Sequence, residues 1–97
     1  MKLRFTPRAT ENLVEIADYL HERNPVAARR VRAVIYEGLQ NLILFPNAGR
    51  LQNVERVRKF VTRKYVYLIY YIVDEGAEEI VILNVKHSAR ERDYEDA

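Results

Sequence analysis

The sequence predicts an α+β domain, in which an N-terminal antiparallel helical hairpin packs on a three- to four-stranded antiparallel sheet. A helix-start signal, an N-cap residue followed by proline, occurs twice in the first half, at Thr6-Pro7 and at Asn24-Pro25. The second half holds β-branched and aromatic runs separated by short turns, which favours antiparallel strands. We assign residues 1–97 to a single domain, because domains usually have about 50 to 250 residues.

A short strand and a helix are expected before the first connection. Residues 1–5 alternate weakly between apolar and polar side chains, which predicts a strand. Apolar residues then recur at helical spacing from Ala9 to Leu20, with acidic residues on the opposite side. This pattern predicts a first helix that ends near Arg23.

A second helix follows almost at once. Its apolar periodicity runs from Ala28 to Phe45 and stops before Pro46 and Gly49. Helices joined by so short a connection form an antiparallel hairpin with a shared apolar face. That face is too broad for two helices alone, so it requires a sheet as cover.

The remaining chain is predicted to form that sheet. Residues 54–62 alternate in part, and residues 65–73 form a nearly continuous β-branched and aromatic run that is typical of a central strand. Residues 74–76 predict a turn, and residues 79–86 a further strand. These three segments and the short N-terminal strand give the predicted three or four strands.

Tyrosines are concentrated in the predicted central strand. By strand alternation, Tyr70 lies on one face, while the other face carries Tyr65, Tyr67 and Tyr71. Aromatic rings beside cations can stack nucleobases. The preferred interpretation is structural: Tyr70 packs under the helices, and the other three form a half-buried face.

The composition excludes several kinds of active site. The chain has no cysteine, and its two histidines, His21 and His87, have no metal-ligand spacing. Its three glycines are isolated, so no phosphate-binding loop is present. His87 and Ser88 are adjacent on an extended chain and point to opposite faces, which disfavours a serine nucleophile. We therefore expect no metal and no cofactor.

The N-terminus carries basic residues without the apolar run of a signal peptide. No segment approaches the roughly 18 uninterrupted apolar residues of a membrane span. A cytoplasmic protein that does not contact membranes is expected.

Cations gather in the second half of the chain. Between residues 50 and 64 a single acid, Glu55, stands among six cations, which are Arg50, Arg56, Arg58, Lys59, Arg63 and Lys64. Further basic residues follow the last predicted strand, namely His87, Arg90 and Arg92. The sequence does not determine strand order, so it does not tell whether the two groups converge.

Three interpretations of these basic residues remain open. A metal-independent ribonuclease needs a base, an acid and cations, and the candidates for these roles are Arg58, His87, Arg90 and Tyr94. The same residues could instead contact DNA or an acidic protein. The third interpretation makes His87 a hydrogen-bonded structural residue at a strand end.

Four segments, in order, resemble the ParE toxins of the RelE/ParE superfamily. The first is the helix start FTPRATENLVEIADYL, and the second helix follows with NPVAARR and closes in LILFPNAGR. The others are the strand pair VRKFVTRKYVYLIYYIVD and the ending ILNVKHSARER. Together they cover nearly the whole chain.

The resemblance implies two helices on an antiparallel sheet and a type II toxin–antitoxin module. The partner would be a ParD-like antitoxin of the ribbon-helix-helix type, whose C-terminal segment folds across the toxin. The apolar groove of the hairpin is the expected antitoxin site, formed by Leu13, Ile16, Leu20, Val31, Ile35 and Leu39.

ParE toxins poison DNA gyrase by binding, whereas their RelE relatives cleave mRNA. The predicted central strand has no cation between its ends, which favours the gyrase branch. The expected target-binding residues are Arg58, Lys59, Arg63, Lys64, His87, Arg90 and Arg92. The alternatives are a RelE-like mRNA endonuclease and a detoxified module that binds only its antitoxin.

Overall fold

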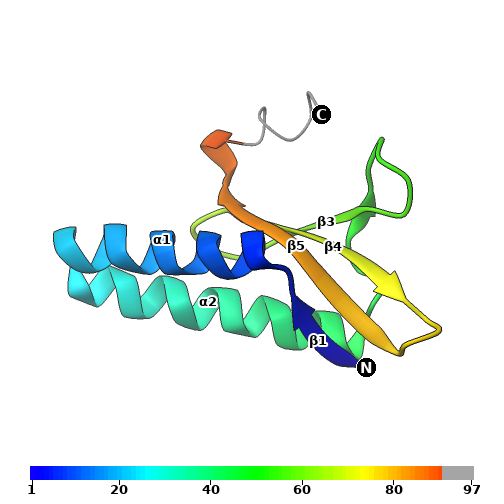
Figure 1. The fold of residues 1–97 in the computed structure, drawn as a ribbon. Coiled ribbons are helices and arrows are strands. Elements are labelled where there is room, and N and C mark those ends of the chain that lie inside the picture. Colours follow the sequence, from blue (N-terminus) through cyan, green and yellow to red (C-terminus); the bar gives the residue numbers. More distant parts are fainter. Residues whose placement is uncertain (91–97) are drawn as a thin grey trace.

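The structure, a computed structural model, describes residues 1–90 (Figure 1). Within these residues, two helices, five strands and a final 3-10 turn follow one another. They are β1 (Lys2–Phe5), α1 (Pro7–Arg23), α2 (Pro25–Leu44), β2 (Arg50–Leu51), β3 (Arg58–Val61), β4 (Tyr67–Asp74), β5 (Glu79–His87) and η1 (Ser88–Arg90).

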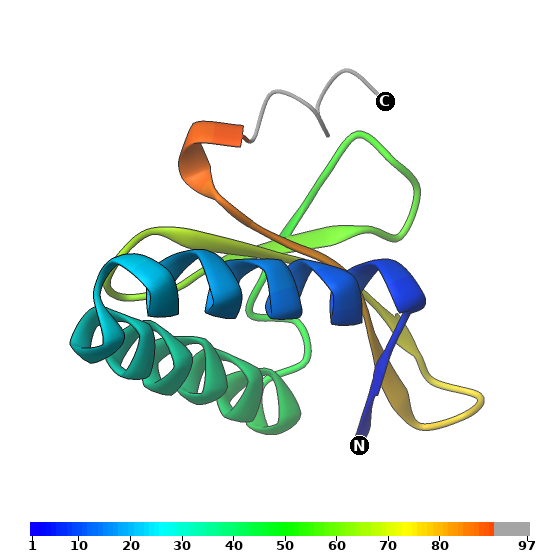
Figure 2. The ribbon, with the colours of Figure 1, turned by 60° about the vertical axis from the view of Figure 1, so that its left-hand side comes forward.

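Both predicted helix starts are confirmed. The Thr6 hydroxyl accepts a hydrogen bond from the backbone N–H of Ala9, at 3.1 Å. The Asn24 side chain likewise accepts one from Ala27, at 3.1 Å, and each cap is followed by proline. Each cap satisfies a backbone donor that a helix start leaves open. The two helices lie side by side on one face of the sheet (Figures 1 and 2).

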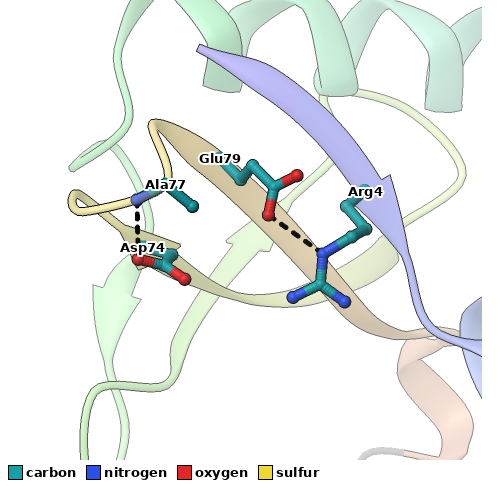
Figure 3. A network of polar contacts seen from close by, with 4 residues as sticks. All are labelled: Arg4, Asp74, Ala77 and Glu79. Carbon is teal, nitrogen blue, oxygen red and sulfur yellow. Dashed lines mark hydrogen bonds and ion pairs between the residues drawn. The ribbon is translucent and has the colours of Figure 1, made fainter.

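The sheet has five strands in the order β1-β5-β4-β3-β2. Its fold class agrees with the α+β prediction, but β1 pairs with β5 in parallel, whereas the other pairs are antiparallel. Arg4 Nε donates to Glu79 Oε1 at 3.0 Å across the parallel pair, and Asp74 Oδ1 accepts from Ala77 N–H in the turn before β5 (Figure 3). The parallel pair joins the first and last strands, a long-range contact that local sequence patterns do not reveal.

The predicted strand over residues 54–62 is wrong at its start. Arg56 has a positive φ of 67°, and Val57 N–H donates to Val54 O in a turn, so β3 begins only at Arg58. The short strand β2 (Arg50–Leu51), which pairs with β3, was not predicted.

The central strand also begins later than predicted. Tyr65 and Val66 have φ values of 63° and 44°, in the left-handed region that a β-strand does not occupy. They belong to the loop before β4, which begins at Tyr67. The predicted turn after β4 is confirmed, and β5 continues to His87.

The predicted orientation of the tyrosines is wrong. Tyr67 and Tyr71 face the helices and are 7% and 0% exposed, in one cluster with residues of α2 and β5. Tyr70 lies on the opposite face, where it is 1% exposed and packs with Val57 and Leu68. A strand that is apolar on both faces does not specify which face the helices cover. We call the face of Tyr70 the open face, because neither helix covers it.

Candidate functional site

Arg58 holds a loop against the sheet. Its Nη1 donates to Gly49 O at 2.8 Å and to Asn47 O at 3.4 Å. The Tyr71 hydroxyl, from the neighbouring strand, donates to Pro46 O at 2.7 Å and accepts from Gly49 N–H at 2.8 Å. We call this arrangement of Arg58, Tyr71 and the loop 46–49 the clasp. Part of the donor capacity of Arg58 is therefore used within the protein.

The sheet register keeps Arg58 apart from His87. Arg58 lies opposite Tyr71, and His87 lies opposite Tyr67, on the two sides of β4. Four residues separate these positions along β4, which is about 13 Å at about 3.3 Å per residue. The two residues do not form one catalytic group, and Tyr94, another of the predicted ribonuclease candidates, lies outside the described residues.

His87 has two structural contacts. Its Nδ1 accepts a hydrogen bond from the backbone N–H of Ala89 at 3.1 Å, at the start of η1. Its ring packs edge-on against Tyr67, with ring centres 5.3 Å apart. Because Nδ1 is an acceptor, the neutral ring carries its proton on Nε2. These contacts agree with the third interpretation of His87, that of a hydrogen-bonded residue at a strand end.

The loop between β3 and β4 lies beside the end of β5. Thr62 holds the loop in place through two hydrogen bonds. Its hydroxyl accepts one from Tyr67 N–H at 2.9 Å and donates one to Lys64 O at 2.8 Å. Val66 O accepts from Ser88 N–H at 3.0 Å. Arg63, in the same loop, forms an exposed ion pair with Glu37 at 3.5 Å. We call residues 62–66 together with His87 the loop end of the sheet.

The predicted target-binding residues therefore separate into several groups. Arg63 and Lys64 lie in the loop that the hydrogen bond between Val66 and Ser88 joins to the end of β5, where His87 lies, and the backbone of Arg90 follows in η1. Arg58 belongs to the clasp. Lys59 is opposite Tyr70 and lies on the open face. Arg92 lies outside the described residues.

Further cations lie on the open face. The register aligns Arg50, Lys59, Tyr70 and Asn84 in one row across four strands. Lys86 reaches this row from β5, with its Nζ 5.8 Å from the centre of the Tyr70 ring. We call Arg50, Lys59 and Lys86 the open-face cations. The central strand β4 has no cation between its ends, as the sequence indicated, but the neighbouring strands place cations beside it.

The sequence interpretation missed Arg50 and Lys86 as candidates for this site. The alternation of β5 could have placed Lys86 on one face of its strand. Only the strand order puts β5 and β3 on either side of β4, so the convergence on Tyr70 needed the structure.

Half of the residues of the predicted antitoxin groove belong to the protein's own buried core. Val31, Ile35 and Leu39 are 4%, 5% and 7% exposed and pack against the sheet. The other three predicted residues pack against the same core, namely Leu13, Ile16 and Leu20. Val31, Ile35 and Leu39 are therefore buried within the protein, whereas Leu13, Ile16 and Leu20 are only partly buried and stay predicted antitoxin contacts.

Burial changes the titration of two tyrosines. It raises the pKa of Tyr67, and the nearby Tyr19 phenol adds to the rise. Burial also raises the pKa of Tyr71, although the hydrogen bond from Gly49 and the charge of Arg58 oppose the rise. Both rings therefore favour the neutral phenol in the folded protein.

A loss of stability at alkaline pH is the expected result. A folded pKa above the unfolded value of about 10 stabilises the fold below pH 10, and this contribution is lost as pH rises through the folded pKa. Ultraviolet absorbance should show tyrosines that ionise later than the exposed ones, and Tyr67→Phe should remove one of them. Unchanged late ionisation in this variant would contradict the assignment.

Within the described residues, no group of three or more His, Cys, Asp or Glu side chains is placed to hold a metal ion. In the same part of the chain, no helix has the length and apolar character needed to cross a membrane.

A known protein family matches nearly the whole of the sequence. The family described as "ParE toxin of type II toxin-antitoxin system, parDE" matches residues 3–92. The chain belongs to the ParE toxin family. The match spans both helices and all of the strands except the first residue of β1.

Two relatives are similar over most of their length. The Y4kP protein of Sinorhizobium fredii is 33% identical over 87 residues, which cover 90% of this chain and 88% of the relative. The Toxin RelE2 of Caulobacter vibrioides is 33% identical over 86 residues, which cover 89% of this chain and 93% of the relative. The protein is thus a toxin of a type II toxin–antitoxin system, in the ParE/RelE family.

A solved structure has a similar fold. It is the chromosomal ParDE toxin–antitoxin system from P. aeruginosa, with a TM-score of 0.75 and 26% identity. The match covers 90% of this chain and 95% of the solved chain. The ParE toxin fold therefore extends over nearly the entire protein.

Proposed function

We propose that this ParE toxin inhibits DNA gyrase by binding, in the cytoplasm, and that a ParD-like antitoxin neutralises it. The separation of Arg58 from His87 carries the proposal. One residue is engaged in the clasp and the other in the turn at Ala89, about 13 Å apart along β4. General acid–base catalysis needs groups within hydrogen-bond reach of one substrate, and this pair does not provide it.

The loop end is the surface that we assign to the target. It combines the charges of Arg63 and Lys64 with the side chains of Tyr65 and Val66, which are 40% and 47% exposed. Hydrogen bonds to Thr62 and Ser88 hold both sides of the loop. A rigid loop with aromatic, apolar and cationic side chains loses little entropy when it binds a protein.

A supercoiling assay with purified gyrase tests this assignment. The wild-type toxin should inhibit supercoiling and trap cleaved DNA. Reversing both charges, in the double variant Arg63→Glu and Lys64→Glu, should raise the inhibitory concentration at least about tenfold. Equal loss in the control double variant Arg29→Glu and Arg30→Glu, on the exposed side of α2, would contradict the assignment. If an excess of wild-type toxin does not inhibit supercoiling, the gyrase proposal itself is contradicted.

The antitoxin is proposed to cover exposed apolar side chains of the hairpin. Tyr36, Leu44 and Phe45, in α2 and at its C-cap, are 63%, 70% and 62% exposed. The fold similarity to a ParDE system supports a partner of the ParD kind. A neighbouring reading frame that encodes a ribbon-helix-helix protein, and its co-purification with the toxin, would test the pairing.

A RelE-like mRNA endonuclease is the second candidate, because His87 and Arg90 lie close together in sequence, at the end of β5 and in η1. If the toxin cuts mRNA at mapped positions in a translation reaction and does not inhibit gyrase, the endonuclease function would replace the gyrase proposal. A detoxified module is the remaining possibility, and it would leave growth unharmed when the toxin is expressed without its antitoxin.

A further inference from the structure

The loop between β3 and β4 has a strained backbone at its tip. Tyr65 and Val66 have φ values of 63° and 44°, in the left-handed region that glycine and asparagine adopt more readily than other residues. The conformation is especially unfavourable for a β-branched residue such as valine. Where a turn needs two successive residues with positive φ, asparagine and glycine usually occupy them. The chain therefore keeps two large side chains where smaller residues would fit the backbone better.

Hydrogen bonds on both sides of the loop enforce this conformation. Thr62 N–H donates to Tyr67 O at 2.9 Å, and Tyr67 N–H donates to the Thr62 hydroxyl, also at 2.9 Å. The same hydroxyl donates to Lys64 O at 2.8 Å. Ser88 N–H donates to Val66 O at 3.0 Å, which ties the loop to the end of β5. Backbone strain persists only where the surrounding structure enforces it, and it is concentrated at functional sites.

The two strained residues do not serve the core. Tyr65 and Val66 are 40% and 47% exposed, so the burial of their side chains does not account for the strain. We propose that these two side chains are the anchors of the toxin on its target, and that they enter an apolar pocket on a protein surface. The strained backbone is retained because it presents both side chains together. Tyrosine is among the residues that dominate the binding energy of protein interfaces.

The flanking charges define the border of that pocket. Arg63 and Lys64 directly precede the anchors in the loop, and the ion pair of Arg63 with Glu37 is exposed. Complementary charge on the partner would place acidic side chains around the pocket. The inference rests on the proposed function, because it identifies the contact residues of the surface that we assign to the target.

A nucleobase is the alternative occupant, because a base could stack on Tyr65. Bases stack on aromatic rings and guanidinium planes, so stacking gives no reason to keep a valine in the left-handed region. An apolar pocket gives a reason for both side chains. The observations therefore favour a protein partner over RNA.

The double variant Tyr65→Asn and Val66→Gly tests the inference. Because asparagine and glycine accept a positive φ, the midpoint of thermal unfolding should rise by at least about 4 °C. The loss of both anchors should raise the inhibitory concentration in the supercoiling assay at least about tenfold. It should also relieve the growth arrest caused by toxin expressed without its antitoxin. A merely structural loop would not become more stable and less active at the same time.

Val54→Gly is the matched control. Val54 is 40% exposed in the turn before β3, and it has no positive φ. Glycine there relieves no strain and adds freedom to the unfolded chain. The control should therefore unfold at a lower temperature than the wild type, with unchanged gyrase inhibition and growth arrest.

Two results with the double variant would each overturn the inference. An unfolding midpoint at or below that of the wild type would show that the loop stores no strain. Unchanged growth arrest would show that the two side chains are not anchors. Loss of mRNA cutting with unchanged gyrase inhibition would assign the loop to RNA and overturn it as well. Wild-type toxin that arrests growth without inhibiting gyrase would contradict the gyrase proposal alone, since growth arrest by the double variant still tests the anchors.

Discussion

Gly49→Ala is expected to lower the free energy of unfolding by about 3 kcal/mol, at the upper end of the usual cost of overpacking. A β-carbon at Gly49 would lie 2.7 Å from both Cε1 and the hydroxyl oxygen of Tyr71. The Tyr71 ring cannot move away from the added β-carbon. It is 0% exposed, and its hydroxyl is hydrogen-bonded to the backbone of Pro46 and Gly49. Urea denaturation of the wild type and the variant measures the difference.

Gly76→Ala is the matched control. A β-carbon there would meet only Asp74 Oδ1, at 3.6 Å, which is an ordinary contact. Gly76 also lacks a positive φ, so alanine adds no backbone strain. The change should stay within about 0.5 kcal/mol. Equal destabilisation by the two substitutions would show that the clasp does not limit the space at Gly49.

The clasp also changes how loss of function at Arg58 should be interpreted. Arg58 donates to the carbonyl of Gly49, and Tyr71 accepts from the N–H of the same residue. Both side chains hold one loop, so their substitutions should show energetic coupling. A toxin weakened at Arg58 has first lost an internal anchor, whereas the described contact of Arg63 is an exposed ion pair with Glu37.

The helices were predictable because their signals are local. Thr6 and Asn24 each bond to a backbone N–H three residues ahead, and proline follows each of them. The edge of the sheet was not predictable in this way. Arg4 and Glu79 are 75 residues apart in sequence, and no periodicity in either segment reveals that they meet.

The candidate site shows the same contrast between local features, which the sequence predicts, and long-range placement, which it does not. The sequence identified the basic residue types but not the faces that they occupy. A nearly continuous apolar strand satisfies either orientation, so Tyr70 and Tyr71 could be exchanged between faces without a change in pattern. The packing of Tyr71 against the loop 46–49 decides the orientation, and Lys59 then lies on the opposite face from Arg58.

Ile35→Asp is expected to destabilise the toxin by at least about 4 kcal/mol, because it places an unpaired carboxylate in the core. Ile35 is 5% exposed and belongs to the cluster between the helices and the sheet. Such a loss is comparable to the whole stability of a small domain. Circular dichroism should find the variant largely unfolded, with toxicity and antitoxin binding lost together.

The neighbouring residue separates folding from binding. Tyr36 is 63% exposed on α2, so Tyr36→Asp leaves the core intact and should keep the wild-type unfolding transition within about 0.5 kcal/mol. If the antitoxin covers the exposed side of α2, this variant should remain toxic and escape neutralisation when the two genes are co-expressed. A folded Ile35→Asp variant that alone escapes the antitoxin would instead restore the groove predicted from the sequence. The two substitutions introduce the same charge one residue apart, so a difference between them reports on the face of the helix and not on charge.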